Sequence, residues 1–432
     1  MEADGIPTVS VHTHVFTRLV RSVARVNGLP TLRQAFVPQP VVGRSAGELR
    51  AYIEGDDAVE GGPFIKRLID GLTDVLRQED EAGMDFDRST PRLLDPDTED
   101  NLYQRFEENR WTDFLPIVLP TEARVEAMLK ATSHAPDKVV GRLQPARFRE
   151  LWEYTVEKVA VNAVMAGARP EYFPVILALA ASCVTARSSS TTSQATIAMV
   201  NGPVRNEINM NSGIGAMGPY NHANATIGRA YGLLSQNLQG GSVPSESFMG
   251  SQGNVHSYSA VFAENEERSP WEPFHVQHGH KAEDSAVSLF MGGWYIQFGG
   301  GPRETWEEKF RRSLAACDPY SGPVLALDPL VARGFVDRGF DTKQKLIQWC
   351  VENSLLPARE YWDNQWVQTL LLPQAVAGIE PYASFLKAEP GTPLKMFRPE
   401  DISVVVVGGE TGAMWKILSG TYLKTISVDE WR

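Results

Sequence analysis

The chain has 432 residues, of which 43% are hydrophobic, and a net charge of −12 from 41 basic and 53 acidic side chains. This length allows two or three soluble domains, and the acidic balance argues against nucleic acid or an anionic membrane as the main partner. No apolar run approaches the length of a membrane span, and the N-terminal residues lack the pattern of a signal peptide. The three cysteines, Cys183, Cys317 and Cys350, are widely scattered, which fits a reducing cytoplasm rather than a disulfide framework.

The first 82 residues alternate between strand and helix patterns. Residues 6–11 predict a buried strand, 16–27 a helix, 32–37 a second strand and 61–79 a second helix. This is the rhythm of a doubly wound, flavodoxin-like α/β sheet. Because two strands are too few to bury a sheet on both faces, we expect residues 1–82 to be half of such a domain, completed by a partner chain.

Residues 83–110 are acidic and interrupted by prolines, and predict a linker with a short helix. A larger α/β domain is expected over residues 111–432. Its clearest predicted elements are helices at 155–168, 171–181 and 342–352, strands at 195–200 and 325–327, and a last strand within 402–412 that ends in glycines.

A stretch rich in asparagine and glycine, residues 199–241, follows the strand at 195–200. Glycine allows a close approach of the backbone, and asparagine offers both a donor and acceptors. Helical spacing begins near Asn224, so we expect Asn224 or Thr226 to cap a helix whose first N–H groups favour a negatively charged ligand. The alternative is a long loop stabilised by its own Asx turns.

Acidic and histidine side chains follow the next predicted strand. Glu264 stands at its end in the run Glu264-Asn265-Glu266-Glu267, where a carboxylate beside a glycine-rich loop is well placed for proton transfer. A charged strand terminus without a catalytic role is the alternative. His275, His278 and His280 have spacings that are compatible with metal chelation but match no zinc signature, so a cluster of hydrogen-bonding histidines is the alternative. Cys183 is the thiol of most interest, and an inert buried thiol is the alternative for it.

Segments spread over most of the chain resemble the UGSC-motif (seleno)protein family. They include GIPTVSVHTHVF at 5–16, VPQPVVGRS at 37–45, NSGIGAMGP at 211–219, AENEERSPWEPFHV at 263–276 and VVVVGGETG at 404–412. Members of this family carry a selenocysteine- or cysteine-Gly-Ser-Cys motif upstream of the stretch that corresponds to GIPTVSV. No such motif occurs in this chain, and His12, His14 and His222 stand where the family pattern has other residue types.

The resemblance implies thiol-dependent chemistry at a carbon–heteroatom bond of a small molecule, with carbon–sulfur as the preferred case. We therefore expect the large subunit of a cytoplasmic hetero-oligomer, whose reactive cysteine belongs to a small partner subunit and lies near His12 or His14. The expected catalytic residues are Glu264, His275 and His14. The expected substrate-binding residues are Asn201, Asn211, Ser212, Asn224, Thr226 and Arg229.

Two other functions remain open from the sequence. One is a thiol-independent lyase or hydratase, assisted by a metal at His275, His278 and His280; the sequence requires no cofactor, and a metal is the weaker expectation. The other is a non-catalytic scaffold subunit that stabilises a catalytic partner.

Overall fold

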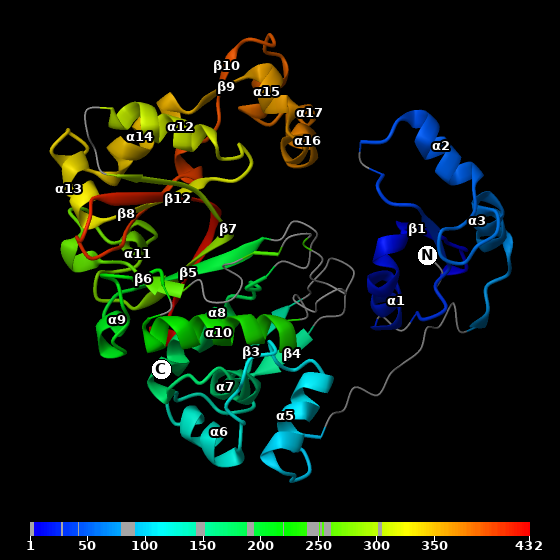
Figure 1. Cartoon of the computed structure of the whole chain (residues 1–432), viewed down its shortest axis with the longest axis horizontal. Helices are drawn as coiled ribbons and strands as arrows, with labels where there is room; N and C mark the ends of the chain where they lie inside the picture. Colours follow the sequence, from blue (N-terminus) through cyan, green and yellow to red (C-terminus); the bar gives the residue numbers. More distant parts are fainter. Residues whose placement is uncertain are drawn as a thin grey trace.

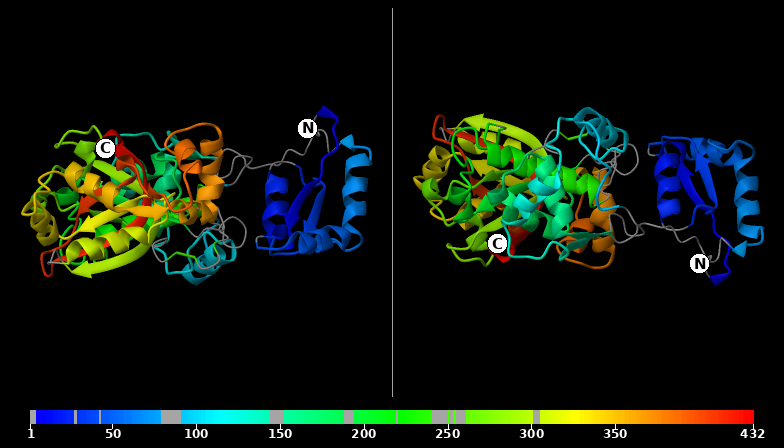
Figure 2. Two further views of the ribbon diagram at one scale, coloured as in Figure 1. Left: turned by 90° about the horizontal axis from the view of Figure 1, so that it is seen from above. Right: turned by 90° about the horizontal axis from the view of Figure 1, so that it is seen from below.

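The computed structural model describes residues 4–26, 29–41, 43–78, 91–143, 152–187, 194–218, 220–239, 250, 253–254, 261–300 and 305–432. They form an N-terminal unit up to residue 78 and a larger unit from residue 91, which lie side by side as separate bodies (Figures 1 and 2). Both units combine helices and strands, so the predicted α/β class is confirmed. None of the helices in these described ranges is long and apolar enough to cross a membrane.

The N-terminal unit is built on a parallel pair of short strands. β1 (Ser10–Thr13) pairs with β2 (Gln34–Val37), and α1 (Thr17–Val26) connects them. α2 (Ala46–Glu54) and α3 (Phe64–Thr73) follow β2. The predicted order of strand, helix, strand and helix is confirmed, with α2 as an additional helix that the sequence pattern did not predict.

Two predicted boundaries in this unit are wrong for local reasons. Pairing of β1 starts only at Ser10, whose N–H donates to Arg33 O at 3.0 Å, whereas the strand was predicted from residue 6. Pro7 has no N–H to contribute to a ladder. The helix predicted from residue 61 starts at Phe64 instead, because Gly61 and Gly62 adopt φ of 72° and 74°, outside helical geometry.

A six-stranded mixed sheet forms the centre of the larger unit, in the order β11-β8-β12-β7-β5-β6. The two longest strands, β7 (Ala286–Gly300) and β12 (Met414–Ser427), pair in antiparallel fashion in the middle. At one edge β8 (Pro323–Leu327) and β11 (Ser403–Val406) run parallel to each other, and at the other edge β5 (Ala195–Asn201) and β6 (Val261–Ala263) do the same.

The sheet curls until its two edges meet. Asn265, two residues after β6, donates its N–H to the carbonyl of Val406 in β11 at 2.8 Å. Side chains alternate along each strand between the inside and the outside of the curl. One buried cluster lies inside and comprises mainly Ile197, Met199, Phe262, Phe290, Val324, Ala326, Val405 and Leu418.

Helices cover the outside of the curl in two groups (Figure 1). The first group packs around residues of β5, β6 and β7 and consists of α6 (Glu122–Leu129), α7 (Val156–Met165), α8 (Phe173–Ala181) and α10 (His222–Asn237). The second group packs around β8, β11 and β12 and consists of α12 (Trp306–Ala315), α13 (Pro329–Val336) and α14 (Lys343–Asn353). Two single-turn helices, α9 (Val204–Glu207) and α11 (Phe274–Gln277), follow β5 and β6.

Smaller elements complete the larger unit. The hairpin β3 (Val139–Leu143) and β4 (Trp152–Thr155) precedes α7, and the antiparallel pair β9 (Leu355–Pro357) and β10 (Pro393–Lys395) follows α14. Four short helices lie between β9 and β10 around a core of their own, namely α15 (Ala358–Asp363), α16 (Gln365–Leu370), α17 (Leu372–Val376) and α18 (Tyr382–Leu386). Within the predicted linker, α5 (Glu99–Glu108) packs Phe106 into the first group of helices.

Candidate functional site

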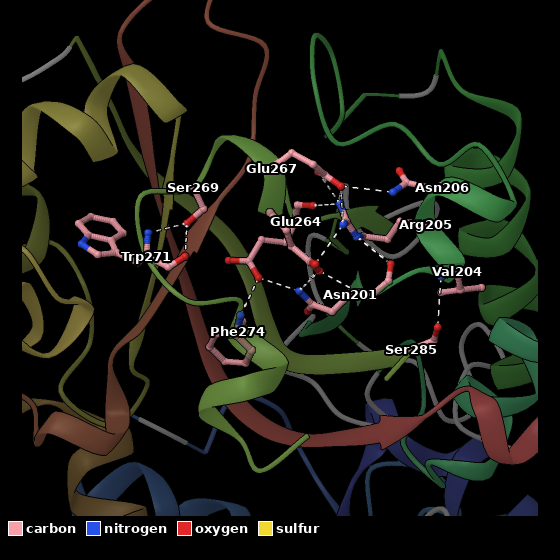
Figure 3. A network of polar contacts seen from close by, with 12 residues as sticks. Asn201, Val204, Arg205, Asn206, Glu264, Glu267, Ser269, Trp271, Phe274 and Ser285 are labelled. Carbon is pink, nitrogen blue, oxygen red and sulfur yellow. Dashed lines mark hydrogen bonds and ion pairs between the residues drawn. The ribbon is translucent and has the colours of Figure 1, made fainter. Parts of the chain in front are cut away.

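Polar side chains gather at the seam where the two edges of the curled sheet meet (Figure 3). Asn201 is the last residue of β5, and Glu264 comes directly after β6. Both are completely buried. Since β5 and β6 are parallel neighbours, their carboxyl ends lie side by side, which brings together two residues that the sequence separates by more than sixty positions.

Glu264 is saturated with hydrogen bonds. Its Oε2 accepts from Asn201 Nδ2 and from Phe274 N–H, both at 2.7 Å. Its Oε1 accepts from Val406 N–H at 3.4 Å and from Lys343 Nζ at 3.3 Å. The side chains of Glu264 and Lys343 are both fully buried. A buried ion pair of this kind is tolerated because further hydrogen bonds satisfy both charged groups.

A second network continues from Asn201. Glu266 Oε1 accepts from Asn201 Nδ2 and from Gly202 N–H, both at 2.8 Å. The buried guanidinium of Arg205 lies 3.0 Å from carboxylate oxygens of both Glu266 and Glu267. Burial raises the pKa of Glu267, but hydrogen bonds from Arg205 and neighbouring groups outweigh this effect and lower the pKa to about 2. Glu267 is therefore ionised at neutral pH.

His275 lies in α11, completely buried beside these carboxylates. Burial lowers its pKa, while the charges of Glu266 and Glu264 and the nearby backbone of Lys281 oppose the shift. The Lys281 backbone is near enough to affect the pKa, but no described residue forms a hydrogen bond of regular geometry with either ring nitrogen. Asn201 Oδ1 also has no hydrogen-bond partner among the described residues. The seam thus contains a neutral imidazole with unused hydrogen-bonding capacity.

His14, the third predicted catalytic residue, lies in the other unit. It is exposed just after β1, and its Nδ1 accepts from Gln39 N–H at 3.2 Å. The structure therefore brings Glu264 and His275 together, whereas His14 belongs to the N-terminal unit.

Three of the predicted substrate-binding residues organise the asparagine-rich loop itself. Asn211 N–H donates to Asn224 Oδ1 at 3.0 Å, and Asn224 Nδ2 donates back to Asn211 O at 2.9 Å. Ser212 O accepts from Gly408 N–H at 3.0 Å, and Asn265 Nδ2 donates to Gly408 O at 2.8 Å. These contacts attach the loop to Gly408, after β11, and thereby to the seam. They are the contacts expected of a long structured loop, which was the alternative to a binding loop.

The start of α10 differs from the prediction. Asn221 is the N-cap residue, and its side chain accepts from Asn224 N–H at 3.1 Å, so the expected caps Asn224 and Thr226 are wrong. Thr226 Oγ1 instead donates to His222 O at 2.7 Å. Arg229 forms two hydrogen bonds to the Asp113 carboxylate, at 2.8 and 2.9 Å. An anionic ligand would have to displace that carboxylate, so the binding role expected for Arg229 stays a prediction.

The histidine triplet does not converge on one point. The rings of His275 and His280 are 6.5 Å apart, while His278 stacks on Tyr422 at 4.1 Å and Phe274 at 4.4 Å. Within the described ranges, no group of three or more His, Cys, Asp or Glu side chains is placed to hold a metal. The metal-assisted alternative therefore gains no support from this geometry.

Comparison with known proteins adds one assignment to this geometry. Residues 1–57 match the model of the UGSC family. Neither the curated proteins nor the solved structures contain a match to the chain. The predicted resemblance is thus confirmed over β1, α1, β2 and α2, whereas the seam with Glu264 and His275 lies outside the matched residues.

The UGSC family takes its name from a thiol or selenol motif, so the environment of each cysteine matters. Cys317 and Cys350 are buried, and burial raises the pKa of both thiols, that of Cys317 to about 12. Cys183 is half-buried, with Tyr154 Oη 3.9 Å from its Sγ and a φ of 54°. None of the three lies at the seam or in the part that matches the UGSC family.

Sequence reasoning missed Lys343 and Arg205, which supply the positive charges of the seam. Arg205 stands five residues after the strand predicted at 195–200, with no pattern that points to a role. Lys343 is the first residue of α14, where a cation meets the positive end of the helix dipole. A lysine at that position is unfavourable unless a nearby anion compensates its charge. This position was the only feature of the sequence that pointed to an acidic partner for Lys343.

Proposed function

We propose that this chain is the large subunit of a hetero-oligomeric enzyme that carries out thiol-dependent chemistry at a carbon–heteroatom bond of a small molecule, with a carbon–sulfur bond as the preferred case. In this proposal His275 moves the proton, and the reactive thiol belongs to a smaller partner chain. The match of residues 1–57 to the UGSC family supports the family-level part of this assignment.

The observation that carries the proposal is the state of His275. Buried polar side chains are nearly always hydrogen-bonded, yet no described residue forms a hydrogen bond of regular geometry with either nitrogen of this ring, although the Lys281 backbone lies near enough to raise its pKa. Its lowered pKa keeps the imidazole neutral at pH 7, the form that accepts a proton. Glu264 and Glu266 are near enough to stabilise the imidazolium that results.

Glu264 has a different part in this proposal. Each of its oxygens already accepts two hydrogen bonds, so the carboxylate has no free position at which to take a proton from a substrate. It orients the segment that carries His275. The neutral imidazole, rather than the carboxylate, is the proton acceptor.

Two of the three cysteines of this chain are poorly suited to supply the reactive thiol. A thiol reacts as the thiolate, which the raised pKa values of Cys317 and Cys350 disfavour. In this proposal the partner's thiol gives its proton to His275 as its sulfur bonds to carbon, and His275 then gives that proton to the atom that leaves the same carbon. One carbon–heteroatom bond thus replaces another without any change of oxidation state.

The test is His275→Asn in the purified complex with its small cysteine-containing partner. We expect kcat/KM to fall by about 10²–10⁴, the usual contribution of a general acid–base group. Mass spectrometry would follow products in which a carbon–sulfur bond is made or broken. His134→Asn, at a half-buried histidine outside the seam whose Nε2 lies 2.8 Å from Glu430 O, is the control and should retain full activity. Full activity of a folded His275→Asn variant would contradict the proposed role of His275 in proton transfer.

The saturated Glu264 favours one second candidate, a scaffold subunit that holds a catalytic partner. In that case His275→Asn leaves turnover unchanged, whereas Glu264→Gln lowers the yield of the assembled complex. Turnover of His275→Asn therefore separates the two candidates: it falls if the chain is catalytic and stays unchanged if the chain is a scaffold.

A further inference from the structure

We infer that Lys343 is a positioning residue that holds α11, and with it His275, through Glu264. This inference rests on the proposed role of His275 but is tested without substrate. A four-residue helix such as α11 is too short to be stable by itself, so its place depends on contacts at its ends.

Lys343 reaches α11 from both ends. At the first residue, Phe274 N–H donates to Glu264 Oε2 at 2.7 Å, and Glu264 Oε1 accepts from Lys343 Nζ at 3.3 Å. At the last residue, Lys343 Nζ donates to Gln277 Oε1 at 3.4 Å. Between these ends the ammonium lies 5.7 Å from the centre of the Phe274 ring. One buried cation thus contacts the helix directly and through a carboxylate.

The same arrangement fixes the charges around His275. Burial lowers the pKa of His275, the charges of Glu266 and Glu264 oppose this shift, and His280 adds to it. Burial also lowers the pKa of His278, and the charge of Lys343 lowers it further. Removal of the ammonium would leave Glu264 as an uncompensated buried carboxylate whose nearest titratable neighbour on α11 is His275.

The stability of variants distinguishes a lysine that only fills space from a lysine that positions α11 through Glu264. If Lys343 only filled space, its effect on stability would add to that of Glu264→Gln. If it acts through Glu264, neutralising Glu264 should relieve part of the damage caused by loss of Lys343.

The experiment uses the full chain with Lys343→Met, Glu264→Gln and the double variant, studied by thermal unfolding and by NMR of the histidine rings. Lys343→Met should lower Tm by several degrees and shift the His275 ring resonances. In the double variant Tm should rise above that of Lys343→Met, and the His275 resonances should match those of Glu264→Gln alone. Lys345→Met, at an exposed lysine of the same helix, is the matched control and should change neither.

Additive losses of Tm, together with His275 resonances in Lys343→Met equal to those of the wild type, would overturn the inference. Should Lys343→Met fail to fold, a folded double variant supports coupling through Glu264, and a double variant that also fails to fold contradicts it. Because no turnover is measured, an active His275→Asn enzyme would refute the proposed function and leave this result standing.

Discussion

At the scale of single residues, Arg205 sets the charge state of a carboxylate beside the proposed site. The pKa of Glu267 is about 2 rather than its ordinary 4.5, so Glu267 binds fewer protons in the folded than in the unfolded chain between these values. Its stabilising contribution is complete above pH 4.5 and is lost as the pH falls toward 2. Because the Glu267 side chain is 55% exposed, solvent screening limits the effect to about 1 kcal/mol or less.

We therefore expect Glu267→Gln to be less stable than the wild type at pH 7, with a difference that shrinks as the pH falls below 4.5. Urea unfolding between pH 3 and 7 measures this difference. Glu283→Gln, at an exposed glutamate for which no ion pair is seen among the described residues, controls for the loss of one negative charge. A stability difference that stays constant over the acid range would show that Glu267 is not held ionised by Arg205.

The sequence predicted several site residues but not how they bond. Asn201, Glu264 and His275 were recognised from residue type and from their place after predicted strands, and the structure places all three at the seam. The position of Lys343 at the start of a helix suggests a nearby anion but does not identify Glu264, because α14 meets the seam only through the curl of the sheet. Arg229 looked available for an anion because Asp113, which binds it, lies more than a hundred residues away in the sequence.

At the scale of elements, the turn after β5 depends on Gly202. Its φ is 80°, and a Cβ there would lie 2.0 Å from Asp284 O, a backbone atom that cannot move aside. Gly202→Ala should therefore destabilise the chain by about 1–3 kcal/mol from backbone strain alone, with the steric clash in addition. The substitution should also weaken the contact between Gly202 N–H and Glu266 that helps to close the seam.

Chemical unfolding of Gly202→Ala and Gly215→Ala separates the two effects. Gly215 has a similar φ of 73°, but a Cβ at Gly215 would meet nothing within 4 Å. Gly215→Ala should thus show only the cost of the backbone conformation. Equal losses in the two variants would mean that the close approach to Asp284 is unimportant.

Elements with one strong local pattern were predicted well, and those that depend on distant partners were not. β5, β8 and β11 are continuous apolar runs because helices cover one face and the inner core covers the other. β12, in contrast, alternates buried and exposed residues only in part and changes register against β7 at several points. Its place in the middle of the sheet is a tertiary property that no local pattern specifies.

At the scale of the whole molecule, the N-terminal unit exposes an apolar surface that favours a partner. Among the strands described, β1 pairs only with β2, and Val11 in β1 is 50% exposed. Ile65, Ile69 and Leu72 of α3 are 43%, 55% and 53% exposed and are spaced four and three residues apart, so they share one face of the helix. Contiguous exposed apolar residues of this kind mark interaction sites.

We predict that this face of α3 binds the small cysteine-containing partner. Ile69→Glu and Leu72→Glu should each weaken the complex without unfolding the chain, since both side chains are exposed. Co-expression followed by size-exclusion chromatography and intact mass spectrometry measures the association. Lys66→Ala, an exposed polar position on the same helix, is the control and should leave the complex intact. A loss of about 1.5–3 kcal/mol is expected for each apolar side chain that would otherwise be buried, enough to weaken binding by about tenfold or more. If the Glu variants bind the partner as tightly as the wild type, this face of α3 has another role. If the chain alone is monodisperse and fully active, the hypothesis of an enzyme divided between two chains is wrong.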